Sequence, residues 1–256
     1  PHIAHSDQFE TYARTRQNVN LVCAQCHSTS PRKLPGGIAR RNSAEYRDAI
    51  AGSCYSQLTC IQCHEPHTAT GREWSNTPDQ DDASCLKCHQ QYQTTDAIEE
   101  HTHHRAGTEG SRCMNCHMPK VTEGLLDMVR SHQITSPNSR RIVTAGGINA
   151  CNLCHLDQSI DWTLNHIKQW YGTTYDRGLL DRRYPDTQSP AGLVWITDKR
   201  PEFRLVALGA IKRRGAHWLA QEVVRQLDDS YVVHRQFAQN TLEQLLEKDL
   251  GPLGYH

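Results

Sequence analysis

The chain has 256 residues, with 28 basic and 28 acidic side chains, and it is rich in His (16) and Cys (11). Hydrophobic residues make up 37% and aromatic residues 7%, which is little for a globular chain of this length. No stretch approaches the ~18 uncharged apolar residues of a membrane-spanning helix, and zero formal net charge disfavours nucleic-acid binding through bulk charge. We therefore expect something other than side chains to supply part of the core.

Ten of the eleven cysteines form five C-x-x-C pairs, and each pair is followed at once by His. In chain order the motifs are CAQCH (Cys23, Cys26, His27), CIQCH (Cys60, Cys63, His64), CLKCH (Cys85, Cys88, His89), CMNCH (Cys113, Cys116, His117) and CNLCH (Cys151, Cys154, His155). Two thiols three residues apart lie on one side of a helical turn, where they can add to the two vinyl groups of one porphyrin edge. The adjoining His can then bind the iron. The pattern predicts five covalently attached c-type haems with these five histidines as proximal ligands.

Other interpretations of the cysteine pairs explain less. A zinc ribbon or a disulfide accounts for paired cysteines but not for the histidines. One residue in sixteen is His, so five matches in five trials would arise by chance on the order of once in a million. No βαβ pattern surrounds any pair, which disfavours a thioredoxin-like motif. Cys54 stands outside the pairs; we expect a small buried apolar residue, with a haem ligand, an intermolecular disulfide or a reactive thiol as open alternatives.

Residues 1–157 form the predicted haem-bearing module, with about one motif per thirty residues. This part contains one Phe and one Trp, so we expect five porphyrins to replace the hydrophobic core and the chain without haem to be unfolded. Short helices at the motifs and long irregular loops should dominate. Pairs of glycines at 36–37 and 146–147, and Pro137, mark loops.

Residues 158–256 lack cysteine and show helical periodicity, which predicts a small helical domain. We expect a helix over 160–171 that ends at Gly172, a loop over 172–198, and a helix between Pro201 and Gly215. A third helix carries Leu219, Val223 and Leu227. A fourth begins after Ser230, has Val233, Phe237, Leu242 and Leu245 inward, and ends before Gly251. Its sequence resembles the second helix of a HEAT-type repeat; a plain helical cap is the alternative. An array of fewer than three such repeats is not stable alone, so we expect this domain to dock on the haem-bearing module or on a partner.

Five irons need five further ligands to be six-coordinate. Met114 and Met118 lie too near their own motif to turn back to that iron, and we expect Met128 to be a packed apolar residue. Bis-His ligation, with low reduction potentials, is therefore the default. The favoured distal ligands are His67, two members of the cluster His101, His103 and His104, then His132, and finally His5 or His2. His67 lies too close to CIQCH to bind the iron of that motif, so we expect it to bind a neighbouring haem. We expect His166, His217 and His234 to be partly exposed helix residues and His256 to be a mobile terminal residue.

The ordered set CAQCH, CIQCHEPH, CLKCH, HTHHRAGTEGSRCMNCHMPK, RSHQI and NACNLCHLDQSIDW resembles a widespread group of multihaem c-type cytochromes. That group is related to hydroxylamine oxidoreductase and the pentahaem nitrite reductases, and many members carry a helical HEAT or tetratricopeptide tail. The resemblance covers about residues 20–172. It implies a mainly α fold with long irregular loops around stacked haems, axial ligation by His67 and His132, and ligands near His101 and His104, with His104 first. Members typically read CHDPHS and DHSF where this chain has CHEPH (63–67) and SHQI (131–134), and their N-terminal catalytic module is expected to be absent.

Three kinds of function stay open. The first is electron transfer through closely spaced bis-His haems, with other redox proteins or haem subunits as partners. The second is a homopolymeric extracellular filament in which His2 or His5 binds a haem of the next subunit, or membership of a larger respiratory complex. The third is reduction of a small nitrogen or sulfur oxyanion at an open haem, although the C-x-x-C-K motif of the related nitrite reductases is absent. An enzyme is therefore disfavoured.

Two further expectations concern the mature protein. Haem is attached to thiols outside the cytoplasm, and the chain starts at Pro1 without a signal peptide, so we expect a processed periplasmic or extracellular protein. Five bis-His haems with ionised propionates would bring its net charge to about −5.

Overall fold

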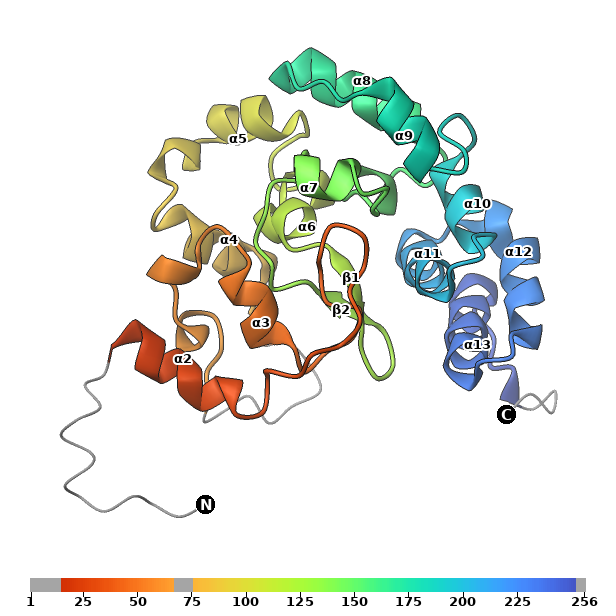
Figure 1. The fold of residues 1–256 in the computed structure, drawn as a ribbon, viewed down its shortest axis with the longest axis horizontal. Helices are drawn as coiled ribbons and strands as arrows, with labels where there is room; N and C mark the ends of the chain where they lie inside the picture. Colours follow the sequence, from red (N-terminus) through yellow and green to blue (C-terminus); the bar gives the residue numbers. More distant parts are fainter. Residues whose placement is uncertain (1–14, 67–75, 252–256) are drawn as a thin grey trace. The chain divides into compact units, whose positions relative to one another are not determined.

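The computed structural model describes residues 15–66 and 76–251 and is drawn in Figure 1. These residues are mainly helical with irregular loops, which confirms the expected fold class. By contacts the chain divides into two compact units. Of the described residues, unit 1 holds 15–31, 43–66, 76–118 and 132–135, and unit 2 holds 32–42, 119–131 and 136–251. The expected boundary between 157 and 158 concerns the haem-loaded protein and stays a prediction.

Unit 1 carries the first four motifs on short helices. Its elements are α2 (Arg16–Ala24), α3 (Glu45–Ile50), η1 (Tyr55–Gln57), η2 (Cys60–Gln62), α4 (Pro78–Leu86), η3 (Gln90–Tyr92), α5 (Thr95–Thr102), η4 (Glu109–Ser111) and α6 (Cys113–His117), where η marks a 3₁₀ helix. The side chains of Thr15, Thr77 and Thr94 accept a hydrogen bond from the first turn of α2, α4 and α5. These helices are too short to be stable by propensity alone, so tertiary contacts must hold them.

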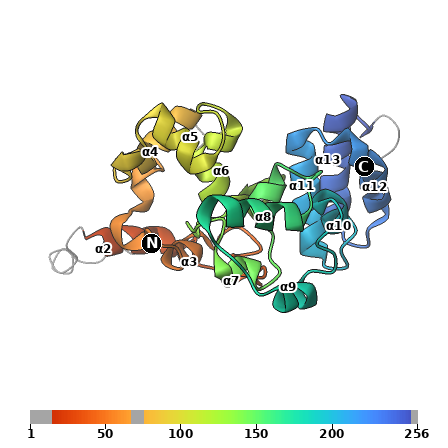
Figure 2. The same cartoon turned by 90° about the horizontal axis from the view of Figure 1, so that it is seen from above.

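Unit 2 contains a two-stranded antiparallel hairpin, labelled in Figure 1, and a run of helices, labelled in Figure 2. Its elements are β1 (Lys120–Glu123), β2 (Met128–Arg130), α7 (Arg140–Val143), η5 (Cys151–Leu153), α8 (Ile160–Tyr171), α9 (Arg177–Arg183), α10 (Ala191–Ile196), α11 (Pro201–Arg214), η6 (His217–Leu219), α12 (Ala220–Arg225), η7 (Gln226–Asp228) and α13 (Val232–Leu246). In the hairpin Glu123 pairs with Met128 and Lys120 with Arg130, with an irregularity between Lys120 and Thr122.

The predicted helices 160–171 and 201–214 are confirmed as α8 and α11. Each ends at a glycine in the left-handed conformation, Gly172 at φ 64° and Gly215 at φ 58°. The predicted loop 172–198 was wrong in part, because it contains α9 and α10. Leu180 of α9 and Trp195 of α10 are almost fully buried, so packing rather than periodicity stabilises these short helices.

The last helix differs from the prediction at its start. It begins at Val232 after Tyr231, and Asp229 rather than Ser230 accepts the hydrogen bond from the Tyr231 N–H at 2.9 Å. It ends at Leu246, before Gly251 as predicted, with Glu247 in the left-handed conformation. The residues of this helix that were expected to face inward do so: Phe237, Leu242 and Leu245 are buried, and Val233 packs against the core.

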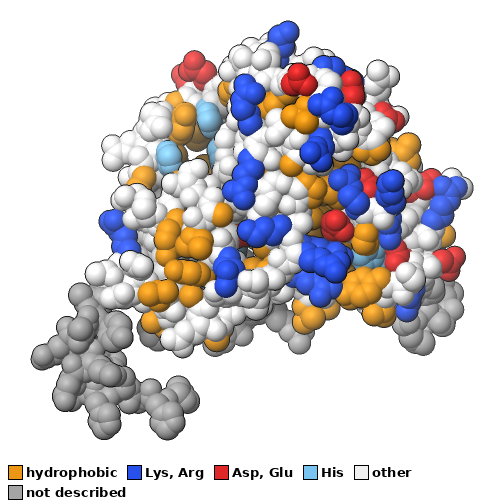
Figure 3. All heavy atoms as spheres, in the orientation of Figure 1, with side chains coloured by type: hydrophobic (Ala, Val, Ile, Leu, Met, Phe, Trp, Pro, Cys, Tyr) orange, Lys and Arg blue, Asp and Glu red, His pale blue; other side chains and the backbone are white. Residues whose placement is uncertain are grey.

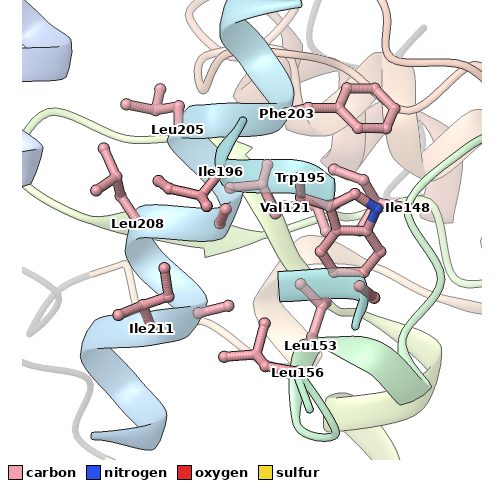
Figure 4. Packing of buried hydrophobic residues seen from close by; sticks show 14 of the residues in the cluster. Val121, Ile148, Leu153, Leu156, Trp195, Ile196, Phe203, Leu205, Leu208 and Ile211 are labelled. Atoms are coloured by element: carbon pink, nitrogen blue, oxygen red, sulfur yellow. The ribbon is translucent and has the colours of Figure 1, made fainter. Parts of the chain in front are cut away.

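The hydrophobic core of the described residues lies entirely in unit 2 (Figure 4). Trp195 and Phe203 pack near Val121 of β1, and Leu205, Leu208 and Ile211 of α11 line the same cluster. Segments of the predicted haem module also contribute, through Leu34, Ile38, Val121, Met128, Ile142, Val143, Ile148, Leu153 and Leu156. The expectation that 1–157 has no side-chain core was therefore wrong for these segments. Met128 is buried in this core as expected.

Unit 1 has almost no side-chain core. Among its described residues only Ala44 and Met114 are buried hydrophobic side chains. Four C-x-x-C-H motifs thus lie in a unit whose own apolar burial is too small to offset the conformational entropy of folding.

Candidate haem-binding site

Each motif forms a tight helical turn. The backbone N–H of His27, His64, His89 and His155 donates to the carbonyl of the first Cys of its motif, at 2.9 to 3.1 Å. In the fourth motif the turn is part of α6, which runs from Cys113 to His117. This i to i+4 bond brings the two thiols to one side of the turn and the imidazole next to them. All eleven cysteines lie in the described ranges, and none of them forms a disulfide there.

Two pairs of imidazole rings in unit 1 lie parallel at a separation that fits an iron between them. The ring centres of His64 and His132 are 6.1 Å apart with planes inclined by 19°. Those of His101 and His117 are 6.2 Å apart with planes inclined by 2°. Rings in direct contact lie closer, as Tyr92 and His101 do at 4.2 Å. A metal–imidazole nitrogen bond is about 2 Å long and the ring centre lies about 1 Å further, so two imidazoles on one iron have centres about 6 Å apart.

The His101–His104 cluster is divided by the end of α5. His101 lies in the last turn of the helix, and His103 follows in the left-handed conformation at φ 55°, which turns the chain. The Nδ1 atom of His104 lies 2.6 Å from the carbonyl oxygen of Thr102. Its ring packs on Gly110, where an added Cβ would lie 2.2 Å from His104 Cδ2. The structure therefore places His101, and not His104, beside His117.

Two of the histidines predicted to be proximal ligands are oriented through their Nδ1 atoms. His27 Nδ1 lies 2.8 Å from a carboxylate oxygen of Glu45 on α3, and His117 Nδ1 lies 3.0 Å from the carbonyl oxygen of Thr135. Such a partner fixes the tautomer, so that Nε2 is the atom presented to a metal. Burial by itself would raise the pKa of Glu45, but hydrogen bonds from His27 and from backbone amides outweigh it and hold that pKa below its usual value. Burial lowers the pKa of His64, His101 and His117, which favours the neutral, metal-binding form.

Apolar side chains beside the first two motifs are exposed. Leu21 and Val22 directly precede Cys23 and are 43% and 68% exposed, and Ile61, inside the second motif, is 51% exposed. Figure 3 shows hydrophobic side chains gathered on the surface over α2 and α3. A contiguous apolar surface at a cofactor attachment site fits a large apolar group that covers it. Together with the sparse core of unit 1, this fits a porphyrin.

The fifth motif lies in unit 2 and is organised by Asn152, between its two cysteines. The buried Asn152 side chain donates to the carbonyls of His155 and Gln158, at 3.1 and 3.0 Å, and accepts from Thr163 of α8 at 2.7 Å. The His155 ring lies 5.0 Å from the ring of Trp162. Trp162 in turn lies 4.2 Å from the ring of His166, whose Nδ1 is 2.9 Å from the Trp162 carbonyl oxygen.

Several predicted residues behave differently or lie elsewhere. His67 and His5, both expected ligands, and His2 and His256 lie outside the described residues. Cys54 is half-buried, and burial raises the pKa of its thiol. His166 is half-buried and His217 exposed, as expected. The expectation for His234 was wrong, because its ring is fully buried between α13 and the Asp229 carboxylate, with Nδ1 3.3 Å from that group.

Sequence reasoning missed Glu45, Thr135 and Asn152. Each acts across a turn or between helices, and no spacing rule identifies such partners. Asn152 alone had a local signal, as a small amide inside a motif that can bond to its own backbone.

Comparison with known proteins agrees with this site. The Cytochrome c552 family model matches residues 97–177, a span that includes His101 and the fourth and fifth motifs. The match covers less than a third of the chain and makes this part of it similar to Cytochrome c552. No curated protein and no solved structure gives a match. Within residues 15–66 and 76–251, none of the helices combines the length and apolar character needed to span a membrane.

Proposed function

We propose that the protein transfers electrons through five covalently bound c-type haems, most of them with two histidine ligands and a low reduction potential. The observation that carries this proposal is the pair of parallel imidazole couples, His64 with His132 and His101 with His117, at 6.1 and 6.2 Å. Two protein ligands fill both axial positions of an iron and leave no site for a substrate. Bis-His ligation also favours low potentials, because no Met thioether raises them.

The chain's residues take the following parts. The ten motif cysteines attach the cofactors, and His27, His64, His89, His117 and His155 are the proximal ligands. His101 and His132 are the distal ligands for which the ring geometry gives support, while His67, His104 and His5 are proposed for the other three irons. Each haem, when bound, supplies one iron that gains or loses a single electron. Glu45 and the Thr135 carbonyl orient the imidazoles of His27 and His117.

A second candidate function is reduction of a small nitrogen or sulfur oxyanion. The match to the Cytochrome c552 family favours it, since that match is compatible with haem-based electron transfer and with nitrite-reductase-like activity. It requires one iron with an open axial position. A filament with haems continuous across subunits is a variant of the first proposal, in which the residues before Thr15 would reach the next subunit. Covalent attachment through thiols further implies export, to the periplasm or the cell surface.

One experiment separates these functions. The holoprotein is reduced with dithionite and its absorption spectrum recorded before and after carbon monoxide, with haem quantified as the pyridine haemochrome. The proposal predicts about five haems per chain, one per motif, and no spectral change on carbon monoxide addition. Binding of carbon monoxide to about one haem in five would reveal an open iron and favour the oxidoreductase. Absence of covalent haem would overturn both.

A further inference from the structure

Helices α2 and α4 present the first cysteine of the first and third motifs in the same way. Each helix has nine residues, follows a Thr whose side chain accepts from the third residue of the helix, and ends one residue after that cysteine. The capping Thr precedes the cysteine by the same number of positions, from 15 to 23 and from 77 to 85. The sequences TRQNVNLVCAQCH and TPDQDDASCLKCH therefore share the pattern T-x₄-[N/D]-x₂-C-x₂-C-H.

In the second and fourth motifs the first cysteine lies at the start of a helix and not near its end, because η2 and α6 begin at that cysteine. The N–H of the first residue in a helix has no acceptor within that helix. The N–H of Cys60 donates to Asn20 Oδ1 at 2.9 Å, and the N–H of Cys113 donates to Asp82 Oδ1 at 3.0 Å. Asn20 and Asp82 occupy the same position of the shared pattern. Asn20, on α2 of the first motif, therefore caps η2 of the second motif. Asp82, on α4 of the third motif, caps α6 of the fourth motif.

Both capping side chains are held by a second bond and are shielded from water. Asn20 is 3% exposed and donates through Nδ2 to the Leu58 carbonyl at 3.0 Å. Asp82 Oδ2 lies 2.9 Å from Arg112, the residue directly before Cys113. In each case the two groups bonded by the cap lie within two residues of one another on the second segment, so the cap fixes that segment's direction as well as its position.

The two caps bring the first cysteines of neighbouring motifs together. Burial and the nearby Cys23 thiol raise the pKa of Cys60 to about 11, and the nearby Cys85 thiol, together with burial, raises the pKa of Cys113. The fifth motif cannot repeat the arrangement, because Val143 and Ile148 stand where the pattern requires Thr and Asn or Asp. Spacing along the chain would favour another pairing, since His64 and His89 are the closest proximal histidines in sequence, 25 residues apart (89 − 64).

We infer that the first four motifs are two copies of one two-motif module, and that their haems form two close pairs, first with second and third with fourth. The inference rests on the proposed function, because it concerns the haems that these motifs would bind. The first cysteine of every motif becomes the thioether on one porphyrin edge. A cap that holds the first cysteines of two motifs near each other therefore brings two haem edges together, and Asn20 and Asp82 are the positioning residues of the two pairs.

The pairing is tested on the holoprotein by circular dichroism in the Soret band, where closely packed identical chromophores give a split signal. Haem is first counted as the pyridine haemochrome, so that a missing cofactor, which would overturn the proposed function, is distinguished from a wrong pairing. One variant lacks haems one and two (Cys23, Cys26, Cys60 and Cys63→Ser). The matched variant lacks haems one and four (Cys23, Cys26, Cys113 and Cys116→Ser) and retains the same number of haems.

The inference predicts that the first variant keeps about half of the split signal and the second loses nearly all of it, because two independent pairs contribute additively. A split signal retained in the second variant would mean that haems two and three form a pair, and would overturn the inference.

Two further measurements keep the test decisive if these variants do not fold. Asn20→Leu and Asp82→Leu should weaken the split signal, whereas Asp82→Asn, which keeps the acceptor oxygen for the Cys113 N–H, should retain it. An equal effect of the Leu variants and of Asp82→Asn would contradict the role of the caps. In a crystal structure of the intact holoprotein, the sulfur atoms of Cys23 and Cys60, and those of Cys85 and Cys113, should lie within about 4.5 Å. Well-separated sulfurs would refute the pairing.

Discussion

The imidazole rings of His101, in the last turn of α5, and His117, at the end of α6, lie parallel to within 2° with their centres 6.2 Å apart. This separation matches that of two imidazole ligands on opposite sides of one metal. This geometry selects His101 from the cluster His101, His103 and His104.

Replacement of His101 by Ala should leave one haem without its distal ligand. We expect about one haem in five to become high-spin and to bind carbon monoxide, because each of the five motifs carries its own haem iron. Absorption and electron paramagnetic resonance spectra of the purified holoprotein measure this. His103→Ala is the matched control, because His103 lies at the left-handed turn after α5 and should leave the spectrum unchanged. An all-low-spin spectrum in His101→Ala would remove this ligand assignment.

Replacement of His132 by Met should keep the second iron six-coordinate but raise its reduction potential. A thioether ligand stabilises ferrous iron relative to imidazole, as in cytochromes with Met/His ligation. Potentiometric titration should show one haem displaced to higher potential and the others in place. His132→Ala separates ligation from packing, because it should instead give a high-spin iron. Identical titrations for His132→Met and the wild type would show that His132 binds no iron.

Glu45 should lower the potential of the first haem. Its carboxylate accepts a hydrogen bond from His27 Nδ1 at 2.8 Å, which makes the imidazole a stronger donor and stabilises ferric iron. Glu45→Gln should raise that potential by about 60 mV, equivalent to a tenfold change in the ferric–ferrous equilibrium. Spectroelectrochemistry measures the shift. The exposed Glu100 on α5 offers a control, and a Glu100→Gln variant with the same shift would show that the effect is one of overall charge.

Local signals in the sequence were sufficient for some of the fold. Gly172 marks the end of α8, and Pro201 and Gly215 mark the two ends of α11, through conformations set within a few residues. They were insufficient for α9 and α10, because Leu180 and Trp195 are stabilised by partners far away in the chain. The motifs predict the haem-attachment residues, and that prediction needs no knowledge of the fold. The choice between His101 and His104 depends on where α5 ends, at the left-handed His103, and no rule for spacing predicts that turn.

His234 should make unit 2 less stable in acid. Burial, together with the positive charges of Arg204 and Arg40, lowers its pKa from the ordinary 6.5, although Asp229 opposes this. The unfolded chain therefore takes up a proton at a pH where the folded chain does not, so stability is full above about pH 6.5 and falls as the pH drops below it. Thermal unfolding between pH 7 and 5 should show a falling midpoint. In His234→Gln this dependence should be weaker; an unchanged pH profile would contradict the assignment.

The two units should respond differently to loss of haem. Unit 1 has only Ala44 and Met114 as buried hydrophobic side chains among its described residues, whereas unit 2 has a core of its own around Trp195 and Phe203. If the full chain is produced without haem attachment, we expect proteolysis and fast amide hydrogen exchange over residues 15–31 and 76–118, and protection over 191–245.

This expectation replaces the simpler one, from composition, that the whole chain unfolds without haem. Phe237→Ala tests the core directly, because truncation of a buried Phe costs about 3–5 kcal/mol and should remove the protection of 191–245 in the haem-free chain. The holoprotein, with both units protected, is the reference. Equal protection of the two units without haem would show that the porphyrins are not needed for the fold of unit 1, and rapid exchange throughout would show that unit 2 also depends on them.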